Sequence, residues 1–126
     1  MKLETDAKSG YAVGRILVAM AAVIPLMAMA LPALQPPPGW HRTSDRLECT
    51  YELANFVESV VFVAQLIAPA ETLGHHPDVT IAYNRVSLSL TTHDADGLTD
   101  LDFQLAEEID AIAQLQDPPL SCLSQE

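Results

Sequence analysis

A proline-rich stretch divides this chain into two parts of opposite character. Residues 16–34 read ILVAMAAVIPLMAMALPAL and contain no polar side chain, whereas polar and apolar residues are mixed after Trp40. Between the two parts lies QPPPG at 35–39, which cannot continue a helix because proline lacks a backbone N–H and its ring clashes with the preceding turn. The sequence therefore predicts an apolar segment with its linker, a folded domain and a C-terminal tail, at residues 1–38, 39–117 and 118–126.

The apolar segment has several interpretations. Residues 16–34 approach the length that spans a bilayer, about 20 residues, and Arg15 precedes them. The same stretch fits a secretory signal, because AMA at 28–30 matches a small-x-small cleavage pattern. Pro25 and Pro32 fit both interpretations less well. Export and membrane anchoring, with membrane contact through residues 16–34, therefore stand beside a helix packed into the domain or an oligomer interface, and an extension outside the working domain.

The net charge argues against binding to nucleic acid, and the cysteine spacing argues against a zinc site or a redox pair. The chain has 17 Asp and Glu against 6 Lys and Arg, and the resulting charge of -11 repels phosphate backbones and anionic lipid headgroups. We therefore expect no direct binding to nucleic acid. Cys49 and Cys122 show neither C-x-x-C spacing nor a nearby histidine, so the sequence predicts ordinary thiols rather than a zinc site or a redox pair.

Two stretches carry apolar residues at the spacing of a helix. The first helix is predicted over residues 54–73, with a buried stripe of Phe56, Val60, Val63, Ile67 and Ala70. The second is predicted to begin at a capping box formed by Thr99 and Asp102 and to stop before Pro118. Its predicted stripe consists of Leu101, Leu105, Ala106, Ile109 and Ile112.

Alternating apolar residues predict strands at 46–53, 79–83 and 86–90. Only Asn84-Arg85 separates the last two strands, which favours a tight antiparallel hairpin. A strand, a helix, a hairpin and a second helix predict an α+β fold, in which a small antiparallel sheet of about four strands has its helices packed on one face. The opposite face would then be left for solvent, a partner subunit or a ligand.

Three histidines lie at the ends of the predicted elements. His75 and His76 follow the first helix, and His93 closes the second strand of the hairpin. Glu71 precedes His75 by one helical turn, close enough for its carboxylate to orient that imidazole. Taken singly, each histidine could be a solvated residue at an element end, and Asp102 could be a capping acid only. A metal site is a further alternative, although neighbouring side chains diverge and cannot easily share one ion.

Taken together, these residues form a longer pattern. It reads Glu71, three residues, His75-His76-Pro77, five residues, Tyr83, nine residues, His93, eight residues, Asp102. This pattern resembles the signature of the pterin-4a-carbinolamine dehydratase family, and the similarity extends from residue 39 to about residue 113. The chain departs from the family at Cys49, Leu53 and Gly74, where the family usually has an Arg-like, an aromatic and an acidic or amide residue. The apolar segment also replaces an amphipathic helix of the family.

The resemblance implies a function. The family removes water from a 4a-hydroxytetrahydropterin to give a quinonoid dihydropterin, in the recycling of tetrahydrobiopterin, without a cofactor or a metal. By resemblance, His76 and His93 form the acid–base pair, His75 binds and orients the substrate, Glu71 orients His75, and Asp102 positions His93 or the pterin edge. A cytoplasmic location and a homodimer or homotetramer are also implied. The alternative is a scaffold that keeps the fold but works through protein contacts, as a Rubisco assembly factor or a transcriptional coactivator does.

Overall fold

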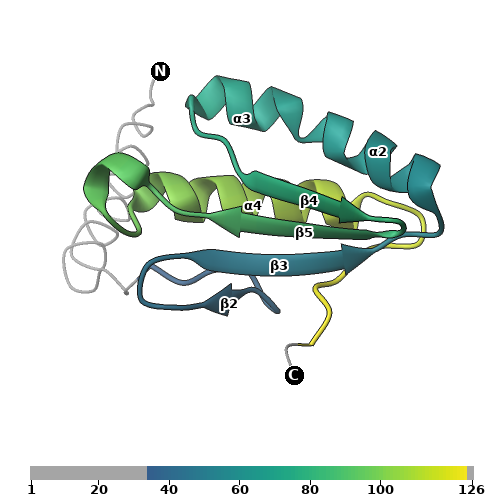
Figure 1. Cartoon of the computed structure of the whole chain (residues 1–126), viewed down its shortest axis with the longest axis horizontal. Coiled ribbons are helices and arrows are strands. Elements are labelled where there is room, and N and C mark those ends of the chain that lie inside the picture. Colours follow the sequence, from purple (N-terminus) through teal and green to yellow (C-terminus); the bar gives the residue numbers. More distant parts are fainter. Residues whose placement is uncertain (1–33, 125–126) are drawn as a thin grey trace, which may run out of the picture. The chain divides into compact units, whose positions relative to one another are not determined.

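The structure is a computed structural model that describes residues 34–124 (Figure 1). Residues 16–33, for which a signal, a membrane anchor or a packed helix was predicted, lie outside the described residues. The elements are β2 (His41–Arg42), β3 (Leu47–Glu52), α2 (Phe56–Gln65), α3 (Ile67–Leu73), β4 (Asp78–Ala82), β5 (Arg85–Leu90), the 3-10 helix η1 (His93–Ala95) and α4 (Asp100–Gln114). The strands form one antiparallel sheet in the order β2-β3-β5-β4, which confirms the predicted α+β class.

The two long central strands present one apolar face to the helices. Alternation buries Leu47, Cys49 and Tyr51 of β3 beside Leu90, Leu88 and Val86 of β5, residue opposite residue. Helices α2, α3 and α4 contribute their apolar residues to the same core. The other face of the sheet is polar, and its side chains line a shallow hollow of about 270 Å³. The prediction of helices on one face of the sheet is thus confirmed.

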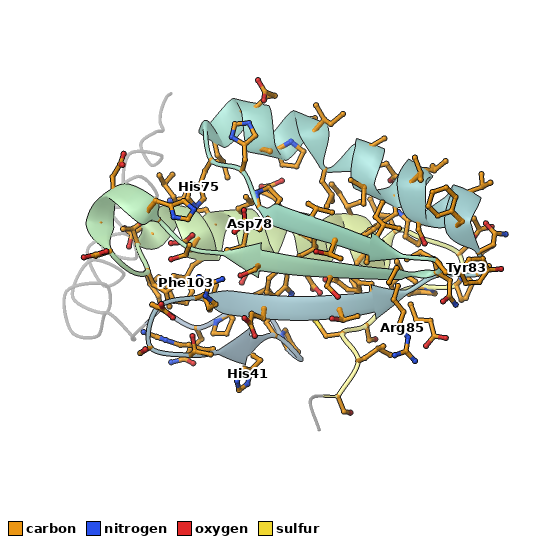
Figure 2. The ribbon with its side chains drawn as sticks, viewed as in Figure 1. His41, His75, Asp78, Tyr83, Arg85 and Phe103 are labelled. Carbon is orange, nitrogen blue, oxygen red and sulfur yellow. A yellow bond between two sulfur atoms is a disulfide. The ribbon has the colours of Figure 1, made fainter. Side chains whose placement is uncertain are left out.

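The hairpin between β4 and β5 turns one residue earlier than predicted. Ala82 pairs with Arg85, so the turn consists of Tyr83 and Asn84 rather than Asn84 and Arg85. The Asn84 side-chain amide donates to the Leu53 carbonyl at 3.0 Å, which fixes this residue in the turn at the end of β3. Tyr83 consequently adopts a positive φ of 52° and is exposed instead of continuing the strand (Figure 2).

The first predicted helix is two helices, α2 and α3, that meet at Leu66. Pro69 explains the break, because it has no N–H to donate to the Gln65 carbonyl and its ring crowds that turn. The predicted buried stripe is confirmed at Ala70 and in part at Val63, which packs against the core, but it is wrong at the other three positions. Ser59, Phe62, Leu66 and Ala70 are buried, whereas Phe56, Val60 and Ile67 are exposed. The stretch Phe56–Leu73 has a mean hydropathy of 1.5, high enough to pass as a membrane span by composition, so apolar spacing alone could not select the packed side.

The second predicted helix is confirmed as α4. It begins at the capping box of Thr99 and Asp102 and ends at Gln114, before Pro118. Leu105, Ala106 and Ile109 are buried as predicted, and Leu101 and Ile112 are partly buried.

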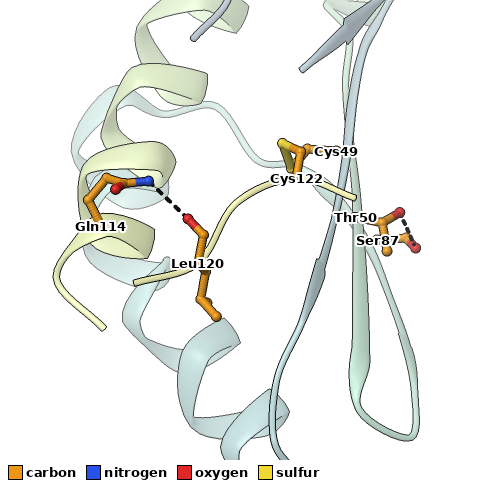
Figure 3. The surroundings of a disulfide bond; sticks show 6 residues. All are labelled: Cys49, Thr50, Ser87, Gln114, Leu120 and Cys122. Atoms are coloured by element: carbon orange, nitrogen blue, oxygen red, sulfur yellow. Dashed lines mark hydrogen bonds between the residues drawn. A yellow bond between two sulfur atoms is a disulfide. The ribbon is translucent and has the colours of Figure 1, made fainter. Parts of the chain in front are cut away.

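The prediction of two ordinary thiols is wrong, because Cys49 and Cys122 form a disulfide (Figure 3). Their Cα atoms are 5.3 Å apart although 73 positions separate them in sequence. After α4 the chain reverses and runs back along β3, where the Leu123 N–H donates to the Thr50 carbonyl at 2.7 Å. Residues 118–124 therefore pack on the domain, and Cys122 reaches a cysteine that the sequence alone placed far away.

Candidate active site

The three predicted histidines line one shallow pocket. The pocket has a volume of about 300 Å³ and is bounded by Gly74, His75, His76, Thr91, Thr92, His93 and Asp94. Two chain segments build it, namely the connection from α3 to β4 and the connection from β5 to η1. The remaining histidine, His41, lies on β2 at the opposite edge of the sheet from β4, as Figure 2 shows. The convergence of the three histidines is the main feature of this site.

Gly74 sets the directions of the first two histidines. It caps α3 in the left-handed conformation, with φ 62° and ψ 32°, and its N–H bonds to carbonyls of the last helical turn. A glycine adopts this conformation without steric cost and ends a helix abruptly. Just after it, the backbone N–H of His75 still donates to the Ala70 carbonyl at 3.0 Å. His75 thus stays against the helix end and points inward, whereas His76 faces solvent.

His75 is held by Asp102 rather than by Glu71. The distance from His75 Nε2 to Asp102 Oδ1 is 2.7 Å, and the two side chains are only 11% and 0% exposed. The predicted pairing of Glu71 with His75 is therefore wrong. Its physical cause is the packing of α3 against α4, which brings the first turn of α4 beneath the histidine.

Two threonines hold Asp102 in turn, and the sequence did not identify either as a site residue. Asp102 Oδ2 accepts a hydrogen bond from the Thr92 hydroxyl at 2.7 Å and another from the Thr99 N–H at 2.9 Å. The hydroxyls of Thr92 and Thr99 lie 2.7 Å apart. With His75, the buried carboxylate has three hydrogen-bond partners, which is how proteins accommodate such a group. The capping box predicted the Thr99 contact, whereas the contact of Thr92 with Asp102 was not predicted.

His76 pairs with Glu71 on the outside of the domain. The distance from His76 Nε2 to Glu71 Oε2 is 2.6 Å, and the side chains are 61% and 69% exposed. Glu71 thus orients a pocket histidine, as predicted, but the neighbouring one. Spacing along an ideal helix favoured His75, and the left-handed turn at Gly74 reverses that preference.

His93 begins η1 instead of closing β5. The strand ends at Leu90, and Thr92 then forms an isolated bridge with Gly97. This bridge closes a small loop in which His93 is exposed at the pocket rim. Asp102 bonds to His75 and not to His93, so of its two predicted roles the positioning of His93 is not supported, and contact with the pterin edge stays a prediction.

The pocket combines one fixed imidazole with two exposed ones. Imidazole donates and accepts protons near neutral pH, which suits it to general acid–base catalysis. Within residues 34–124, no three side chains of His, Cys, Asp or Glu come together in a way that could hold a metal ion. The arrangement can therefore bind a small polar molecule and exchange protons with it.

Comparisons with known proteins identify the family of this chain. The model of the family described as pterin 4 alpha carbinolamine dehydratase matches residues 27–112, which include the sheet and the whole pocket. A protein of Thermosynechococcus vestitus, provisionally named pterin-4-alpha-carbinolamine dehydratase, is 49% identical over 76 residues, which are 60% of this chain and 80% of the relative. A protein of the same provisional name from Chloroflexus aurantiacus is 51% identical over 75 residues, 60% of this chain and 81% of the relative.

A solved structure gives the same result. The crystal structure of a transcriptional coactivator/pterin dehydratase from Brucella melitensis superimposes with a TM-score of 0.57 at 36% identity, covering 60% of this chain and 83% of the other. The family match includes more than half of the chain and all the histidines of the pocket. The chain therefore belongs to the pterin 4 alpha carbinolamine dehydratase family.

Proposed function

We propose that this protein dehydrates a 4a-hydroxytetrahydropterin to a quinonoid dihydropterin, as part of tetrahydrobiopterin recycling. The observation that carries the proposal is the convergence of His75, His76 and His93 on one pocket of about 300 Å³. Membership of the dehydratase family supports the same reaction class.

The reaction requires two proton transfers and no change of oxidation state. The lone pair of a ring nitrogen forms a double bond to C4a while the bond between C4a and the hydroxyl oxygen breaks. An acid protonates the departing oxygen, and a base takes a proton from the ring, so the products are the quinonoid dihydropterin and one water. Each well-placed acid or base contributes about 100- to 10,000-fold.

The burial of the three imidazoles suggests their roles. His76 and His93 are exposed at the pocket and serve as the acid–base pair. His75 uses Nε2 to bond to the buried Asp102, which leaves Nδ1 for a ligand and makes this ring suited to binding and orienting the pterin. Asp102 is a positioning residue for His75, and Glu71 is one for His76.

A direct assay tests this function. The full chain should accelerate the dehydration of a synthetic 4a-hydroxytetrahydropterin, followed by the absorbance of the quinonoid product. Replacing both His76→Ala and His93→Ala should reduce the acceleration at least about 100-fold, because both proton transfers lose their catalyst. His41→Ala is the matched control, since it removes an exposed histidine far from the pocket. An inactive wild type with a folded circular dichroism spectrum would contradict the proposal.

One apolar surface indicates contact with another protein chain. Helix α2 leaves Phe56, Val57, Val60 and Val61 exposed, an apolar strip that a soluble domain normally covers. We propose a second copy of the chain as its occupant, in line with the homodimer or homotetramer expected from the family. Val57→Glu combined with Val61→Glu should then lower the mass measured by light scattering. If the wild type is already a monomer, the strip is left to a different protein partner.

A further inference from the structure

The disulfide is built into the core of the described domain. Cys49 is only 1% exposed and lies on β3 between two other buried residues, Leu47 and Tyr51. Its partner, Cys122, belongs to the C-terminal segment, residues 118–124 (Figure 3). Since the chain has two cysteines in all, this bond uses both of them. The bond therefore has a structural position, and no third thiol is available to exchange with it.

Other contacts place the C-terminal segment on the sheet independently of the sulfur atoms. The Leu123 N–H donates to the Thr50 carbonyl at 2.7 Å, and the Gln114 side chain donates to the Leu120 carbonyl at 2.9 Å. Leu120 is buried in the main core. The two cysteines are thus brought together by the fold itself, and an oxidising environment would close the bond.

A structural disulfide indicates the compartment in which a protein works. Such bonds persist in secreted and periplasmic proteins, whereas the reducing systems of the cytosol keep thiols reduced. The sequence supplies a separate observation that also indicates export from the cytosol. Residues 16–34 are apolar throughout, Arg15 precedes them, and AMA at 28–30 fits a signal cleavage site.

We propose that the domain formed by residues 34–124 is carried across a membrane by the apolar segment and works in an oxidising compartment, where the Cys49–Cys122 disulfide fastens its C-terminal segment. This location replaces the cytoplasmic one expected from the family resemblance. It does not depend on the proposed reaction, because the disulfide and the pocket share no residue.

The fastened segment lies beside the residue that precedes a buried tryptophan, and this tryptophan would report its release. Gly39 lies against Cys122, so that a Cβ added to Gly39 would come within 3.2 Å of the Cys122 Cβ. The next residue, Trp40, is buried and is the only tryptophan of the chain. Release of the segment should therefore change the emission of Trp40.

Thiol trapping in cells tests the location. The full chain is expressed in a bacterium, quenched with acid, denatured and labelled with maleimide-polyethylene glycol. We expect no labelled cysteine without reductant, two after reduction, and recovery of the protein outside the cytosol. A variant that lacks residues 16–34 should remain in the cytosol with both thiols labelled. Recovery of the full chain in the cytosol with both thiols free would overturn the proposal. A shorter soluble product indicates a cleaved signal, and a full-length membrane product indicates an anchor; either supports export.

A second experiment tests the role of the disulfide on purified full chain. Cys122→Ala should lower Tm by roughly 10–20 °C, given the usual stabilisation by a native disulfide in a domain of this size. It should also shift Trp40 emission to longer wavelength. Ser121→Ala, at the exposed neighbouring position, is the matched control and should leave both unchanged. Dithiothreitol should reproduce the effect in wild type and add nothing in Cys122→Ala. Identical Tm and emission for oxidised and reduced wild type would overturn the fastening role.

Discussion

Two adjacent histidines of the pocket each pair with a carboxylate, and the two pairs differ in burial rather than in length. The inner pair, His75 with Asp102, has a distance of 2.7 Å and side chains 11% and 0% exposed. The outer pair, His76 with Glu71, has a distance of 2.6 Å and side chains 61% and 69% exposed. The two distances alone would suggest interactions of equal strength. The exposed fractions show that the inner pair is shielded from water and the outer pair is not.

The difference lies in what remains when one partner is removed. Water solvates either member of the outer pair, and such exposed pairs contribute about 0–1 kcal/mol to stability. Water cannot reach Asp102, so loss of this carboxylate strands the buried groups that bond to it. The inner pair therefore gives the pocket a rigid side, and the outer pair leaves His76 exposed to solvent and free to move. Each of the following substitutions tests this contrast.

Asp102→Ala should have the largest effect. It leaves His75, the Thr92 hydroxyl and the Thr99 N–H without their acceptor and removes the capping box of α4. We expect a loss of about 3 kcal/mol in the free energy of unfolding, measured by urea denaturation. Asp100→Ala, in the same helical turn but exposed, is the control and should change it by less than about 0.5 kcal/mol. Equal losses for the two variants would show that the buried contacts of Asp102 do not account for its effect on stability.

Thr92→Val should have an intermediate effect. It keeps the shape of the side chain but removes the hydroxyl that donates to Asp102, at an expected cost of about 1–2 kcal/mol. If Thr92 acts through Asp102 on His75, KM for the pterin should rise more than kcat falls, because His75 is assigned to binding. Thr50→Val is the control, since the Thr50 hydroxyl pairs with the Ser87 hydroxyl at 3.0 Å and neither residue lines the pocket. An unchanged KM would leave Thr92 with a structural role only.

Glu71→Gln should change stability least among the pocket variants, by less than about 0.5 kcal/mol. The activity should fall a few-fold, because the His76 ring loses the carboxylate that orients it. Salt screens exposed charges, so the difference from wild type should shrink at high ionic strength. Activities measured at low and high salt provide the check. A loss of stability comparable to that of Asp102→Ala would contradict the contrast.

A third carboxylate, Asp110, allows a test of how burial alone affects a carboxylate that has no histidine partner. Burial raises the pKa of Asp110 above its usual value, so this carboxylate binds a proton more readily in the folded state than in the unfolded chain. The stability linked to this group is therefore present in acid and is lost as the pH rises through the folded-state pKa. Asp110→Asn should raise Tm slightly at neutral pH, and the gain should disappear in acid. A gain that is the same at both pH values would show that the titration is not its cause.

Much of the architecture could be predicted from the sequence, because a strand that is buried on one face must alternate apolar and polar side chains. Leu47, Cys49 and Tyr51 follow that rule, and the capping box located α4 to the residue. The packed side of α2 could not be predicted in this way, because the helix is apolar on nearly all sides.

The site was predicted as a set of residues but not as a set of contacts. The spacing of the signature identified the histidines, and its carboxylates were assigned to the wrong rings. The actual pairings, Asp102 with His75 and Glu71 with His76, depend on the packing of α3 against α4 and on the backbone turn at Gly74. Neither of these produces a regular spacing of residues in the sequence. The disulfide was missed for a related reason, since its cysteines meet only after the chain has reversed behind α4.

The left-handed conformation at Gly74 has a consequence for how this site can diverge. His75 and His76 are chemically identical neighbours, and the torsion angles of the residue before them decide which imidazole is buried and which is exposed. A β-branched residue at position 74 would resist this conformation and could swivel both imidazoles at once. A substitution at this one position could thus exchange the buried and the exposed imidazole without changing either histidine.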